Sequence, residues 1–119
     1  MSPDANEQLL DRHLGAFLLN DLETLMSDYA QDATLIAPWG VYAGPKQIEG
    51  FFRQLMQDFP KGASTLTLDH KTFEGDLVYF TWHGATPTLD VPFAVDTMIV
   101  RDGRIAKQTF AGVLRPLKS

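Results

Sequence analysis

The period of the hydrophobic pattern changes near the middle of the chain, and this change limits the possible folds more than any other feature. Before Gly62, apolar residues recur every three or four positions, as they do on one face of a helix. After Gly62 they alternate, and four stretches are typical of strands: 65–73, 77–85, 91–100 and 105–114. The connections between these stretches are too short for crossover helices, so we expect the strands to be antiparallel neighbours.

Three helices are expected before the strands. Ser2 is a favourable N-cap for the first helix, which should run to about Asn20. Asp21 should cap a second, shorter helix, and a third should occupy residues 44–59, where apolar residues again follow a helical spacing. Each of these helices presents one apolar face, which must be buried against another layer.

Helices followed by hairpin-linked strands predict an α+β fold, with the helices on one face of a strongly curved, mainly antiparallel sheet. We expect one domain over residues 1–119. Between the second and third helices, residues 34–37 should be extended and residues 39–43 should form a loop. The strand at 91–100 is apolar on both of its alternating faces. Because only one face can cover the helices, the other predicts a homodimer formed through the sheet.

Composition excludes several classes of function. The 119 residues include no cysteine, which rules out disulfides and thiolate metal sites, and the three histidines lack the spacing of metal ligands. The net charge is −5, without a basic cluster, which argues against nucleic-acid binding. No apolar run approaches the roughly 20 residues that cross a bilayer. We therefore expect a cytoplasmic protein that needs neither metal nor cofactor, because nucleotide-binding motifs are also missing from the sequence.

Asp96 is the residue that local propensity explains least. It lies in the middle of the apolar stretch 91–100 and shares a strand face with Ala94 and Met98. Aspartate is disfavoured inside strands, and an apolar setting raises the pKa of a carboxyl group. Such a group can donate or accept a proton near neutral pH, so Asp96 is the first catalytic candidate. The alternative is a structural role, in which its carboxylate accepts hydrogen bonds from neighbouring groups.

The order of elements and three sequence stretches resemble the nuclear transport factor 2-like superfamily, in particular its SnoaL-like branch of polyketide cyclases and ketosteroid isomerases. The stretches are 20–34, 42–52 and 96–105. The resemblance implies a cone-shaped α+β barrel, in which three helices close a bent sheet around a pocket, and which is commonly dimeric. It does not fix the activity, because one fold serves many functions.

Compared residue by residue, the resemblance implies one half of a ketosteroid isomerase site. The base of those enzymes, an Asp before a Pro, corresponds here to Ala37. Their protonated Asp, which donates to an oxyanion, corresponds to Asp96. Their oxyanion-binding Tyr aligns near His13, and Tyr29 aligns with a tyrosine found in the pocket of some members. The Asp-Arg-Asp set of limonene epoxide hydrolases, another branch, has no clear counterpart.

These residues give a set of candidates for an apolar pocket. His13 lies on the buried face of the first helix, where it could pair with Asp96 as a second acid–base group. The expected substrate-binding residues are Tyr29, Trp39, Phe52, Phe80, Trp82, Met98, Gln108 and Phe110. We expect either an isomerase, cyclase or hydrolase acting on an apolar carbonyl compound, or a non-catalytic module for ligand binding, protein interaction or dimerisation.

Overall fold

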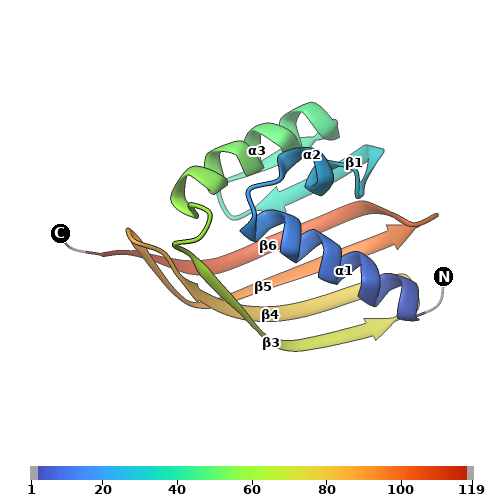
Figure 1. The fold of residues 1–119 in the computed structure, drawn as a ribbon. Coiled ribbons are helices and arrows are strands. Elements are labelled where there is room, and N and C mark those ends of the chain that lie inside the picture. The colour runs from blue at the N-terminus through green and yellow to red at the C-terminus, as the bar shows by residue number, and fades with distance from the viewer. Residues whose placement is uncertain (1–2, 118–119) are drawn as a thin grey trace.

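The computed structural model describes residues 3–117, in which three helices pack on one face of a curved six-stranded sheet (Figure 1). The helices are α1 (Pro3–Leu18), α2 (Leu22–Met26) and α3 (Gly44–Asp58). The strands are β1 (Tyr29–Ala37), β2 (Gly40–Ala43), β3 (Thr65–Glu74), β4 (Leu77–Ala85), β5 (Leu89–Arg101) and β6 (Arg104–Pro116). The predicted α+β class is confirmed, while the expected Ser2 cap lies outside the described residues.

The strand order is β2-β1-β6-β5-β4-β3, and every neighbouring pair is antiparallel except β1 and β6. The four predicted hairpin-linked strands are therefore confirmed. Asp102 and Gly103 form the last tight turn with φ angles of 53° and 76°, the positive values that such hairpins require. The sheet is bent but not closed, because β2 and β3 remain at its two edges. The fold is thus an open cone rather than a complete barrel.

The loop expected at residues 39–43 is wrong. Gly40–Ala43 forms strand β2, which pairs with β1 from Ala37 opposite Gly40 to Thr34 opposite Ala43. Four residues are too few to display a clear alternation, and β2 contacts a partner on one side only, so the sequence carries little sign of it. Asp21 caps α2 as expected, by accepting a hydrogen bond from the Thr24 backbone N–H at 3.2 Å.

The core lies between the helices and the concave face of the sheet. Leu10 of α1 and Ile48 of α3 are fully buried against it. On β5, the even-numbered residues from Ala94 to Val100 are buried, while Phe93 on the opposite face is 49% exposed. The two faces expected for this strand are confirmed, and Asp96 lies on the inner one. Within residues 3–117, no helix has the length and apolar character needed to cross a membrane.

Candidate functional site

Asp96 is buried on the concave face of the sheet, and only 7% of it is exposed. Trp82 Nε1 on β4 donates a hydrogen bond to Asp96 Oδ1 at 3.0 Å, and Gln108 Nε2 on β6 donates one to Oδ2 at 2.9 Å. Burial raises the pKa of Asp96 to about 6, although both hydrogen bonds act to lower it. The carboxyl group is therefore held in one orientation and can change protonation near neutral pH.

A small cavity of about 40 Å³ lies beside Asp96. It is lined by His13, Leu14, Phe17, Phe51, Phe52, Leu55, Leu66, Phe80, Trp82, Asp96, Gln108 and Phe110. Three of these residues, Leu14, Leu55 and Leu66, are only half-buried, so the cavity approaches solvent where α1, α3 and β3 meet. Its volume is well below the roughly 300–1,000 Å³ of typical ligand pockets. Only a small chemical group fits without movement of side chains.

Most of the predicted substrate-binding residues line this cavity, but Tyr29, Trp39 and Met98 do not. Tyr29 and Met98 are almost completely buried outside the lining. Trp39 and Tyr42 instead line an outer groove of about 480 Å³ between β2 and α3, where Trp39 Nε1 donates a hydrogen bond to the Tyr42 hydroxyl at 2.9 Å. Phe51 contributes to both spaces and packs against both aromatic rings of the groove.

His13 and Asp96 both line the cavity, but the hydrogen bonds of His13 go to other residues. His13 is buried as expected, but its Nδ1 lies 3.2 Å from Asp28 Oδ2, and its Nε2 lies 3.2 Å from the Tyr29 hydroxyl. The Tyr29 hydroxyl donates to Gln108 Oε1 at 2.5 Å, and Gln108 in turn binds Asp96. His13 and Asp96 are therefore connected through two intervening side chains rather than directly.

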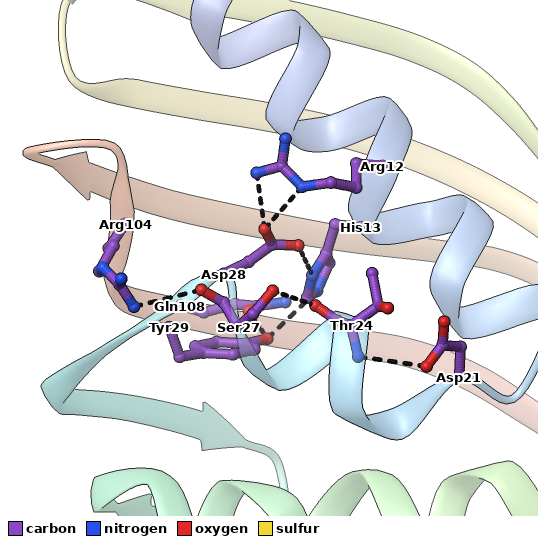
Figure 2. Close-up of polar contacts among 9 residues, drawn as sticks. All are labelled: Arg12, His13, Asp21, Thr24, Ser27, Asp28, Tyr29, Arg104 and Gln108. Atoms are coloured by element: carbon purple, nitrogen blue, oxygen red, sulfur yellow. Dashed lines mark hydrogen bonds and ion pairs between the residues drawn. The ribbon is translucent and has the colours of Figure 1, made fainter.

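Asp28 is the site residue that sequence reasoning missed. It lies in the turn after α2. Aspartate is common in turns because its side chain bonds to nearby backbone groups, so the sequence gives no sign of a further role. Figure 2 shows its carboxylate between two residues of α1, with Arg12 donating to Oδ1 from Nε at 3.0 Å and Nη2 at 2.7 Å, and His13 contacting Oδ2. The backbone oxygen of Asp28 accepts from the Ile105 N–H at 2.7 Å, which fixes the turn to β6.

The electrostatics of Asp28 and Tyr29 differ sharply. Burial tends to raise the pKa of Asp28, but its hydrogen bonds with His13 and Arg12 and their charges outweigh burial and lower it, so Asp28 is a carboxylate at neutral pH. Burial, followed by the negative charges of Asp96 and Asp28, raises the pKa of Tyr29 well above its usual value. Tyr29 therefore keeps its hydroxyl proton, and its neutral hydroxyl can both donate and accept a hydrogen bond between His13 and Gln108.

Other candidates lie away from the cavity. Ala37, at the position of the ketosteroid isomerase base, is buried at the end of β1 and offers only a methyl group. His70 and His83 are exposed on the sheet, and His83 Nδ1 lies 2.9 Å from Asp69 Oδ1. In the part of the chain that the structure describes, no three histidine or acidic residues are placed to hold a metal ion.

Solved structures with this fold cover nearly the whole chain. A provisionally named polyketide cyclase from Sinorhizobium meliloti is 18% identical with a TM-score of 0.73, covering 87% of this chain and 93% of its own. A provisionally named ketosteroid isomerase from Kribbella flavida is 16% identical with a TM-score of 0.76, covering 98% and 84%. A nuclear transport factor 2-like protein from Burkholderia xenovorans is 17% identical with a TM-score of 0.77, covering 98% and 88%.

At these identities the similarity shows the fold alone. No curated protein matches the sequence. The sequence model of the SnoaL-like domain, in contrast, matches residues 10–108, which is most of the chain. Because this model covers most of the sequence, the chain belongs to the SnoaL-like domain family.

Proposed function

We propose that this protein is a cofactor-independent acid–base catalyst of the isomerase or cyclase type, acting on a small carbonyl-bearing compound. The observation that carries the proposal is the Asp96 carboxyl, which faces an apolar cavity with both oxygens held by hydrogen-bond donors and with a pKa of about 6. A carboxyl group with this pKa is suited to accept and return protons near neutral pH.

The chemistry would need only one carboxyl group in contact with the substrate. Above pH 6, Asp96 would remove a proton from the carbon next to the substrate carbonyl, and the electron pair would move to the carbonyl oxygen. Asp96, after exchange of its proton with water, would return a proton to a different carbon as the carbonyl forms again. Alternatively, the enolate would attack a second carbonyl and close a ring, and the alkoxide formed in that step would take the proton from Asp96. Because Ala37 cannot act as a base, Asp96 would carry both proton steps.

The cavity limits the substrate class. A volume of about 40 Å³ accommodates a group of a few heavy atoms, whereas an engineered cavity that binds benzene has roughly 150 Å³. Only the reacting carbonyl portion would therefore enter beside Asp96. Phe51 and Leu55 line both this cavity and the outer groove, so a longer apolar substrate could place its remaining part in the groove.

Proton exchange in heavy water tests this proposal directly. The protein is incubated in D₂O with small β-dicarbonyl compounds and cyclic enones, and deuterium uptake next to the carbonyl is followed by NMR. We expect catalysed exchange that falls by a factor of about 10² or more in Asp96→Asn, the usual contribution of a general base. Asp69→Asn, which changes an exposed carboxylate on β3, should leave the rate unchanged. Equal rates for the protein and Asp96→Asn would rule out the proposed catalysis.

A non-catalytic interaction module is the alternative, and the outer face of the sheet favours a second copy of this chain as its partner. Tyr79, Phe93 and Val113 are 40%, 49% and 47% exposed there, and Phe93 pairs directly with Val113. Val95 pairs with Ala111 in the next row, and Thr97 pairs with both Tyr79 and Thr109 in the row after it, so the middle of the face carries no charge. Such a surface is suited to self-association, because a two-fold contact requires each patch to match itself.

Mass measurement in solution tests the dimer. Analytical ultracentrifugation at micromolar concentration should give twice the chain mass of 13.3 kDa, and Phe93→Asp should give the monomer mass. Val41→Asp is the matched control, since Val41 is 63% exposed but lies on the edge strand β2. A monomer for the unchanged protein, or a dimer that Phe93→Asp leaves intact, would contradict this assignment.

A further inference from the structure

The side chains that link Asp96 to His13 have fixed numbers of protons to donate. An ionised carboxylate only accepts hydrogen bonds, so Gln108 must turn its NH₂ group toward Asp96 Oδ2, 2.9 Å away. Its carbonyl then faces Tyr29 at 2.5 Å. Since that carbonyl also only accepts, the single hydroxyl proton of Tyr29 must be donated to Gln108.

This arrangement determines the protonation of His13. The Tyr29 oxygen has used its only proton, so the contact at 3.2 Å requires His13 Nε2 to carry a proton and donate it. On the other side of the ring, Asp28 is ionised and accepts, so His13 Nδ1 must also carry a proton. His13 is then a cation. The charges then balance: His13 and the half-exposed Arg12 are positive, and Asp28 and Asp96 are negative.

A protonated Asp96 allows the opposite arrangement. Its hydroxyl would donate to the Gln108 carbonyl after the amide turns over, and the Gln108 NH₂ would donate to the Tyr29 oxygen. The Tyr29 proton would then point to His13 Nε2, which must accept and so carry no proton. Between the two arrangements His13 gives up one proton and Asp96 gains one, while Tyr29 and Gln108 keep all of theirs.

We propose that, at neutral pH and above, Asp96 and His13 share one proton through Tyr29 and Gln108, so that His13 is doubly protonated when Asp96 is ionised and singly protonated when Asp96 is a neutral acid. At more acidic pH the pair takes up a second proton and this exchange ends. Tyr29 and Gln108 are positioning residues, because they act on the cavity through Asp96. The use of this proton in catalysis rests on the function proposed above. In one arrangement Asp96 would act on the substrate as a base, and in the other as an acid.

The surroundings leave few other groups that could change this proton count. Among residues 3–117, Arg12 of α1, which binds Asp28, is the only other charged side chain that is hydrogen-bonded to this group of residues. Helix α3 faces the cavity with phenylalanine and leucine side chains, and β4 with Phe80 and Trp82. Trp82 Nε1 can only donate, which fixes one oxygen of Asp96 as an acceptor in both arrangements.

Nitrogen-15 NMR of the histidine rings in the ligand-free protein tests the proposal without any substrate. At pH 8, where Asp96 is ionised, we expect protons on both ring nitrogens of His13. Asp96→Asn imitates the neutral acid, because Trp82 requires the Asn oxygen and leaves the Asn NH₂ facing Gln108. This variant should shift His13 Nε2 into the unprotonated range while Nδ1 stays protonated.

Tyr29→Phe provides the matched control, because it removes the hydroxyl that joins the two halves. In the Tyr29→Phe background, Asp96→Asn should leave the protonation of His13 unchanged. The proposal is overturned if His13 is singly protonated in the unchanged protein at pH 8, a result that needs no variant to fold. It is also overturned if a folded Asp96→Asn leaves His13 as it was, or if its effect persists without the Tyr29 hydroxyl. None of these outcomes depends on proton exchange with a substrate, so this proposal and the proposed function can fail separately.

Discussion

Replacing Asp28 with alanine is expected to lower the free energy of unfolding by about 3–5 kcal/mol, the usual cost of removing one partner of a buried ion pair. Asp28 is only 2% exposed and binds both Arg12 and His13. The variant would lose these charge-assisted bonds and leave a space beside α1. Because the Arg12 side chain is about half exposed and water can solvate its charge once the carboxylate is gone, we expect a cost at the low end of this range, about 3 kcal/mol. Chemical denaturation at pH 7 measures it.

Two further variants separate the possible causes of this loss. Asp28→Asn keeps the shape of the side chain and removes its charge, so most of the loss should remain if charge is the cause. Glu49→Ala breaks an exposed ion pair with Arg53 on α3 and should cost less than about 0.5 kcal/mol. If Asp28→Ala costs no more than Glu49→Ala, the Asp28 carboxylate does not stabilise the fold in the way that its burial indicates.

Much of the fold could be predicted because local patterns and global structure agree. The helical spacing of Leu10 and Phe17, the alternation along 91–100 and the Asp102–Gly103 turn each indicate the element that forms. Strand β2 escaped prediction because its four residues are defined by pairing with β1, and pairing between segments leaves little trace in a short sequence.

Part of the candidate site could also be predicted from local sequence patterns. Asp96 and His13 were identifiable because each is a polar residue on an apolar face, a conflict visible in the sequence itself. Asp28 lies in a turn where an acidic residue is ordinary, and only the packing of α1 against the turn buries it. The connection through Tyr29 and Gln108 joins residues 79 positions apart, which no local pattern specifies.

The stability of the protein is expected to fall as the pH rises from about 4 to about 6, because of Asp96. Burial raises the pKa of its carboxyl from 3.8 to about 6 in the folded state. Between these values the folded protein holds a proton that the unfolded chain has lost, so a rise in pH favours unfolding. The difference in pKa corresponds to roughly 3 kcal/mol, which Asp96 should remove from the free energy of unfolding by pH 7.

Asp96→Asn should lose this downward slope, since an amide does not titrate, and it should be more stable than the unchanged protein at pH 7. Urea denaturation of both proteins at pH 4, 5, 6 and 7 measures the effect. Asp28 does not interfere in this window: its pKa is lowered, so the stability that it contributes is lost only as the pH falls below the ordinary range of a carboxyl. If the free energies of unfolding of the two proteins change with pH in parallel, ionisation of Asp96 does not destabilise the folded protein. The same carboxyl would then be a poor proton acceptor, so this result would weaken the proposed catalysis as well.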